Sequence, residues 1–133
     1  MAPMLRVVMS TTFEHFQEAT LSLTKATHLK ERLAEAFRDH LAYIAADELP
    51  SELREEFRTI RKEVTREPPL VRGEDALRAT VRKMSSDELE SIACRVVYLF
   101  AGLARAQGAN MRMKAAKAAA SAANFVPLYL AEA

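Results

Sequence analysis

The chain has 133 residues, of which 50% are hydrophobic and 28% charged, with a formal net charge of +1. This length accommodates one domain with a substantial core, and three Gly and five Pro are too few for a fibrous or disordered protein. A single cysteine, Cys94, excludes an internal disulfide. The longest uncharged apolar stretch, residues 96–104, is less than half of the roughly twenty residues that span a membrane. We therefore expect a soluble, cytoplasmic protein without a targeting segment.

The N-terminal part of the sequence predicts an irregular arm over residues 1–10, followed by helix. Thr11 and Glu14 have the spacing of a capping box, which marks the start of a helix. Apolar residues then recur at helical spacing until Pro50. Three Thr and one Ser within residues 20–27 weaken helix there, so this segment is either kinked or divided into two helices.

The middle of the chain predicts two further helices separated by a stiff loop. Pro50 opens the first, whose apolar residues form a narrow stripe that requires only one packed edge. Pro68 and Pro69 end it, and we expect Leu70 and Val71 to pack back onto the domain as anchors of the loop. A short helix begins around residues 73–75, with acidic residues in its first turn and basic residues near its end.

The most apolar segment of the chain is a helix predicted over residues 86–107. A second capping box, formed by Ser85 and Glu88, precedes it. Its polar stripe is narrow, so we expect it to be the central helix, with Val97 widening its packed face and Cys94 buried. Gly108 fits a C-cap, a final Ala-rich helix follows over 111–124, and residues 125–133 form an apolar tail.

No pattern of residues in the sequence predicts catalysis or metal binding. The residues three positions before the three histidines are not Glu, so the pattern of a di-iron helical bundle is missing, and no Cys–His zinc spacing occurs. The glycines are isolated, which excludes a Gly-rich nucleotide-binding loop, and Cys94 has no His or Lys one helical turn away. We therefore expect no catalytic, cofactor-binding or metal-binding residues, and a protein that is not an enzyme.

Three groups of residues are candidates for binding. The first two are basic and would contact an anion or a partner: Arg72, Arg78 and Arg82 in one group, and Arg112, Lys114 and Lys117 in the other. The third is apolar and would dock either on its own domain or on a partner: Phe125, Val126, Leu128, Tyr129 and Leu130. Pairing of Arg78 and Arg82 with Glu74 and Asp75 inside the domain is the competing interpretation of the first group.

Together these patterns predict an all-α, single-domain bundle of four to six helices over residues 11–124, with the central helix at 86–107. The predicted function is that of a non-enzymatic interaction protein, such as a small regulatory, adaptor or assembly subunit, acting through helix faces and the apolar tail. We expect it to form a homodimer or to bind another protein. The alternatives are a nucleic-acid-binding module that uses the basic C-terminal third, and a small-molecule binder or enzyme with a pocket near Arg95 and Gly102.

Overall fold

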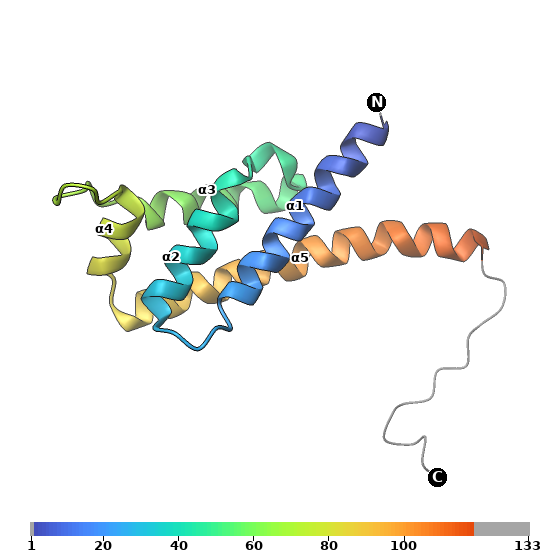
Figure 1. Cartoon of the computed structure of the whole chain (residues 1–133). Coiled ribbons are helices and arrows are strands. Elements are labelled where there is room, and N and C mark those ends of the chain that lie inside the picture. Colours follow the sequence, from blue (N-terminus) through green and yellow to red (C-terminus); the bar gives the residue numbers. More distant parts are fainter. Residues whose placement is uncertain (1, 119–133) are drawn as a thin grey trace, which may run out of the picture.

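The computed structural model describes residues 2–118, with side chains described from Thr11 to Ala109 and at Met111, Arg112 and Ala115. Within this part of the chain the structure is helical and contains no strand, which confirms the predicted all-α bundle (Figure 1). The elements in chain order are α1 (Ala2–Ser22), α2 (Leu29–Asp39), the 3-10 turns η1 (Leu41–Tyr43) and η2 (Ala46–Glu48), α3 (Ser51–Val64), α4 (Ala76–Lys83) and α5 (Ser86–Ala118).

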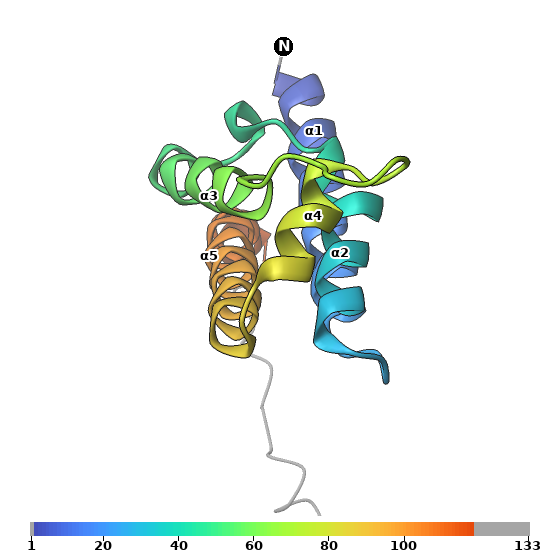
Figure 2. The same cartoon turned by 90° about the vertical axis from the view of Figure 1, so that its left-hand side faces the viewer.

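The helices form two pairs with α4 between them. In the view along the bundle, α3 and α5 lie on one side, α1 and α2 lie on the other, and α4 bridges them at one end (Figure 2). α5, which the sequence predicts as the central helix, contacts α1, α2 and α3, and α2 likewise contacts three helices, α1, α4 and α5. Its C-terminal half extends past the other helices (Figure 1).

The core lies where α1, α2, α3 and one face of α5 meet. The rings of Phe16 in α1 and Phe57 in α3 are fully buried, with their centroids 5.6 Å apart. The predicted stripe of α3 is confirmed, since its apolar residues from Phe57 to Val64 are buried. The side of α5 that enters this core is called its inner face here and consists of Leu89, Ile92, Val96, Leu99 and Leu103.

The start of α1 differs from the prediction. The helix begins at Ala2, where an irregular arm was expected, and Thr11 lies within it, so the prediction of a capping box at Thr11 is wrong. Residues 2–10 contain no Gly, and Pro3 falls in the first turn, where proline sacrifices no helical hydrogen bond. A helix formed by the residues after Thr11 can therefore continue toward the N-terminus without a break.

The Thr-rich segment divides α1 from α2, which is one of the two predicted outcomes. Thr20 donates its hydroxyl hydrogen bond to the Phe16 carbonyl inside α1, and the helix ends two residues later. The side chain of Arg32 in α2 closes the connection by donating to the carbonyls of Leu23 (2.6 Å) and Thr27 (2.9 Å). These bonds satisfy carbonyls in the connection between α1 and α2 that have no helical partner.

Arginine side chains on α3 hold the irregular segment that contains η1 and η2. Arg61 donates to the Ile44 carbonyl (2.8 Å), and its guanidinium lies 5.5 Å from the centre of the Phe57 ring. Arg54 donates to the carbonyls of Leu49 and Asp47. Short 3-10 turns leave many carbonyls unpaired, so these arginines stabilise a stretch that the sequence predicted as regular helix.

A second contact of α3 fixes its position against α5. Arg95 of α5 donates to Glu56 (2.5 Å) and to Glu63 (2.6 Å), which lie on one side of α3. Further along, Gly102 allows close approach, because a Cβ atom at this position would lie 3.1 Å from Cδ2 of Leu53. Arg95 and Gly102 are therefore engaged with α3 and do not face an open pocket at these contacts.

α5 begins as predicted but ends later. Ser85 accepts a hydrogen bond from the Glu88 N–H (3.2 Å), which confirms the N-cap, whereas the Glu88 carboxylate pairs with Arg66. The helix continues through Gly108 to Ala118, so the C-cap prediction is wrong. One Gly costs a helix about 1 kcal/mol, and the Ala, Met and Arg residues around it outweigh this cost. Val97 (42% exposed) and Cys94 are also exposed, contrary to prediction.

Candidate functional site

The loop between α3 and α4 exposes two large apolar side chains. Leu70 is 68% exposed and Val71 is 61% exposed, so the prediction that they anchor the loop to the domain is wrong. Pro68 and Pro69 stiffen the part of the loop that leaves α3. Gly73, with φ +85°, allows the turn that brings the chain back to α4. The loop projects from one end of the bundle (Figure 1).

Hydrogen bonds and ion pairs fix both ends of this loop. At the outgoing end, the Glu67 N–H donates to the buried hydroxyl of Thr80 (2.9 Å), and the Glu67 carboxylate pairs with Lys83 (3.3 Å). At the returning end, Glu74 accepts two hydrogen bonds from the guanidinium of Arg82 (2.9 and 3.3 Å). The exposed position of Leu70 is therefore imposed by contacts on both sides of the loop.

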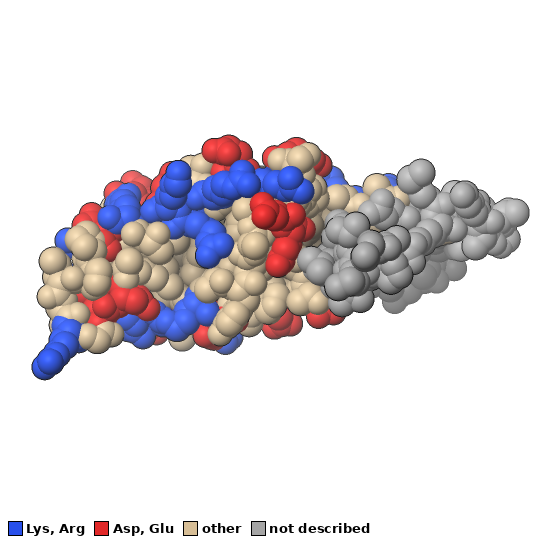
Figure 3. Space-filling model, turned by 90° about the horizontal axis from the view of Figure 1, so that it is seen from above, with Lys and Arg blue, Asp and Glu red and all other residues tan. Residues whose placement is uncertain are grey.

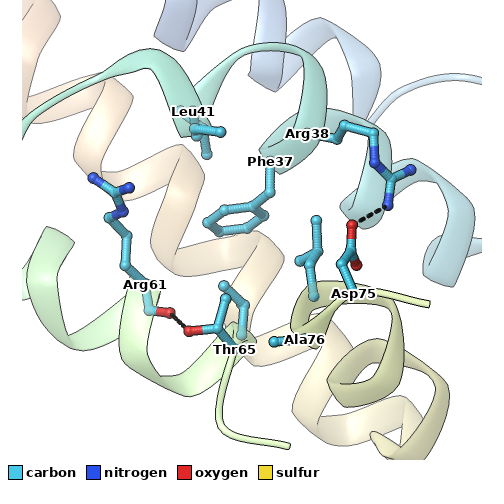
Figure 4. A pocket seen from close by; sticks show the side chains of 10 residues that line it. Phe37, Arg38, Leu41, Arg61, Thr65, Asp75 and Ala76 are labelled. Carbon is cyan, nitrogen blue, oxygen red and sulfur yellow. Dashed lines mark hydrogen bonds and ion pairs between the residues drawn. The ribbon is translucent and has the colours of Figure 1, made fainter. Parts of the chain in front are cut away.

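A mostly apolar pocket of about 330 Å³ lies beside the base of the loop. It opens between α2, α3 and α4, and Figure 4 shows the Phe37 ring near its centre with Arg61 on one side and the Arg38–Asp75 pair on the other. The first and last residues of the loop region, Thr65 and Asp75, belong to its rim. The complete lining is Phe37, Arg38, Leu41, Ala42, Arg61, Val64, Thr65, Asp75, Ala76 and Leu77.

The polar groups of this pocket are committed to structural bonds. Asp75 caps α4 by accepting from the Arg78 N–H (2.8 Å), and it pairs with Arg38 (3.4 Å). The hydrogen bond from the Arg78 N–H, together with the charge of Arg38, holds the pKa of Asp75 below its usual value. Thr65 donates its hydroxyl to the Arg61 carbonyl. An ionised capping carboxylate beside apolar side chains favours binding of an apolar group over acid–base chemistry.

The chain segment that contains the loop carries more positive than negative charge. Residues 61–84 contain seven Lys and Arg against four Asp and Glu, and each of these four acids is paired with a cation. Lys62, Arg72 and Arg78 form no ion pair within the described part of the chain, and the charge of Arg78 acts on the nearby Asp75. Seen from above, Lys and Arg side chains form a band along the upper face of the bundle, with Asp and Glu side chains on both sides of it (Figure 3).

The structure separates the three arginines of the first predicted group. Arg82 pairs with Glu74 inside the domain, as the competing interpretation expected, and this hydrogen bond lowers the pKa of Glu74. Arg78 is exposed and lines a polar pocket between α2 and α4, whereas Arg72 lies on the exposed loop. Arg72 and Arg78 thus form no ion pair within the described residues, although Arg78 shares its pocket with acidic side chains of α2, whereas Arg82 is paired.

The second and third predicted groups are only partly described. Arg112 is exposed and forms no ion pair within the described part of the chain. Lys114 and Lys117 belong to α5, but their side chains lie outside the described ones. The predicted tail, Phe125–Leu130, lies outside the described residues altogether.

Sequence reasoning missed the pocket because its wall is assembled from three helices. Phe37, Leu41 and Val64 have the spacing of ordinary core residues and are buried, and only the arrangement of α2, α3 and α4 places them around one pocket. The Pro-Pro pair was the available signal for the loop, since a stiff segment can hold apolar side chains away from the core. The sequence could not show which way those side chains point.

A second apolar groove, of about 480 Å³, lies between α5 and the α1–α2 connection. Cys94, Val97 and Tyr98 form its α5 wall, and Leu23 and Leu29 lie opposite. The three histidines do not converge: His15 stacks on Tyr43, His28 precedes α2, and His40 follows it. Among the described residues, no group of three or more His, Cys, Asp or Glu side chains is suited to hold a metal.

The chain matches no protein-family model, and no similar protein was found among curated proteins or solved structures. None of the helices between residues 2 and 118 has the length and hydropathy needed to cross a membrane.

Proposed function

We propose that this protein is a non-enzymatic interaction module that binds a partner through the loop and pocket at the α3–α4 end. This site, called the loop site below, consists of the exposed loop side chains Leu70 and Val71, the apolar pocket, and Arg72 and Arg78, which form no ion pair within the described residues. The partner would offer a short segment with one large apolar side chain flanked by Asp or Glu. The apolar side chain would enter the pocket, and the acidic residues would meet these two arginines.

The observation that carries the proposal is the enforced exposure of Leu70 and Val71. Two adjacent large apolar side chains on a stiff loop lose favourable burial, and marginally stable proteins gain nothing from this unless a partner covers them. The bonds at Glu67 and Glu74 hold the loop in one conformation before any partner arrives. Such preorganisation reduces the entropy lost on binding, which makes even a small contact surface effective.

The charge around the pocket supports an acidic partner. All four acidic residues of the 61–84 segment pair with neighbouring cations, whereas Arg72 and Arg78 of the same segment form no ion pair within the described residues. A positive rim around an apolar centre is typical of a site that attracts and orients an acidic peptide. Binding should therefore weaken as the salt concentration rises.

Selection from a random peptide library with the full chain as bait tests this proposal. We expect enriched peptides to share a large apolar residue next to Asp or Glu. The double variant Leu70→Ser, Val71→Ser should bind these peptides roughly tenfold more weakly, because it removes the apolar contact at the centre of the site. Arg78→Glu should weaken binding and reduce its salt dependence.

Leu21→Ser is the matched control, since Leu21 is 50% exposed on α1, far along the chain from the loop. It should leave peptide affinity unchanged, which separates loss of a specific contact from a general loss of surface hydrophobicity. If no peptides are enriched over a column without bait, the proposal fails. It also fails if the selected peptides bind the double variant as tightly as the wild type.

A further inference from the structure

The side of α5 that faces away from the core carries an ordered pattern of side chains. Its members follow one another at spacings of three or four residues, which places them on one face of the helix. All are at least partly exposed. This outer face consists of Asp87, Glu90, Cys94, Val97, Ala101, Arg105, Gly108 and Arg112.

The charges on the outer face have opposite signs at its two ends. Asp87 and Glu90 lie toward the N-terminus of α5, Arg105 and Arg112 lie toward its C-terminus, and the residues between are small or apolar. None of these four charged side chains forms an ion pair within the described part of the chain. A second copy of α5 lying antiparallel would bring acidic residues opposite basic ones at both ends, whereas a parallel copy would juxtapose like charges.

Pairing Glu90 with Arg112 of a second copy determines the register. Residue 101 is midway between them, so a two-fold axis beside Ala101 forms the same ion pair twice. In this register Cys94 is level with Gly108 of the partner, and the two Ala101 residues face each other. Small residues at these levels allow close approach of the helices. The paired stretch, residues 90–112, is about 33 Å long at 1.5 Å per residue.

The groove beside the outer face agrees with this register. Its α5 wall runs from Glu90 to Tyr98, and its volume is about 480 Å³. Met111, which is 64% exposed on the extending half of α5, would lie level with the start of this wall in a second copy. A flexible thioether side chain fits such an irregular apolar groove well.

We propose that the outer face of α5 binds the outer face of a second copy, antiparallel and with the two-fold axis beside Ala101. The extending half of each α5 then covers the groove of the other copy. This inference concerns a surface separate from the loop site and stands independently of the proposed function.

A charge exchange measured by light scattering and sedimentation tests the register. The wild type should have twice the 14.9 kDa mass of one chain. Glu90→Arg and Arg112→Glu should each raise the dimer dissociation constant roughly tenfold, because two-fold symmetry breaks two ion pairs per substitution. The double variant Glu90→Arg, Arg112→Glu should restore most of the affinity. Glu31→Arg and Lys62→Glu are the matched controls and should have no effect, since both side chains are exposed and form no ion pair within the described residues.

Cross-linking gives a second readout that does not depend on charge. In a Cys94→Ser background, Ala101→Cys should form a disulfide-linked dimer on mild oxidation, since the axis brings the two residues together. Ser91→Cys, on a different side of the same helix, should not. A monomeric wild type, no recovery in the charge-exchange variant, or equal cross-linking at 91 and 101 would each overturn the inference. Because peptide binding at the loop site can be measured on a monomer, neither test decides the other.

Discussion

The inner and outer faces of α5 both contain apolar residues, yet only one of them is buried. Leu103 and Val96 on the inner face are at most 1% exposed, whereas Val97, the neighbour of Val96, is 42% exposed. Neighbouring residues of the same type thus have opposite environments, because α1, α2 and α3 cover only one side of the helix. The contrast shows that a narrow polar stripe indicates how much of a helix surface is apolar enough to be buried. It does not indicate how much of that surface the helices of the same domain cover.

Truncation of one residue on each face should produce the largest difference in the free energy of unfolding between the two faces. Leu103→Ala should lower the free energy of unfolding by about 2–5 kcal/mol, because it leaves a cavity in the core. Val97→Ala should change it by less than about 0.5 kcal/mol in the monomer, as expected for a surface position. Urea unfolding at low protein concentration measures both. Equal losses would mean that the two faces are buried alike and would contradict the described packing.

The two helical glycines of α5 provide a smaller and more closely matched test. At Gly108 an added Cβ would meet no atom within 4 Å, so Gly108→Ala should stabilise the monomer by about 1 kcal/mol through helix propensity. At Gly102 the same methyl group would lie 3.1 Å from Leu53, so Gly102→Ala should gain clearly less. Thermal unfolding of the two variants measures the difference. A larger gain at Gly102 than at Gly108 would show that α3 does not approach α5 at Gly102.

The smallest expected effect on stability comes from the paired acids next to the loop, Glu74 and Asp75, in contrast to the charges of the outer face, which form no ion pair within the described residues. The folded-state pKa values of Glu74 and Asp75 are lowered, by the hydrogen bonds from Arg82 and from the Arg78 N–H respectively. Because ionisation of these groups is easier in the folded state, they stabilise the fold at neutral pH. This contribution is lost as the pH falls below the ordinary pKa values, 4.5 for Glu74 and 3.8 for Asp75, toward the lower values of the folded state. The melting temperatures of the wild type and of Glu74→Gln, Asp75→Asn should therefore converge as pH falls through this range. A difference that stays constant from pH 7 to pH 3 would contradict the pairing.

The sequence determined the helical fold, most of the helix boundaries and the residues of the core. These features depend on local rules: Ser85 caps α5, Pro50 precedes α3, Asp75 caps α4, and the spacing of Phe57, Ile60 and Val64 defines a packed stripe. Predictions from local rules were wrong where a capping signal and helix propensity favoured different helix ends. At Gly108 the propensity of the surrounding residues outweighed one glycine, and before Thr11 an uninterrupted run of helix-compatible residues outweighed a capping signal.

Only the tertiary structure decided which apolar residues remain exposed and where the surfaces lie. The sequence shows that Leu70, Val71 and Val97 are apolar, but their environment depends on which helices pass nearby, and this involves residues far apart in the chain. The same is true of charge, since Arg82 pairs with Glu74 and Arg95 with two residues of α3, whereas Arg78 and Arg112 form no ion pair within the described residues. Short-range patterns specify the elements of this fold, and long-range packing specifies the surfaces available for binding.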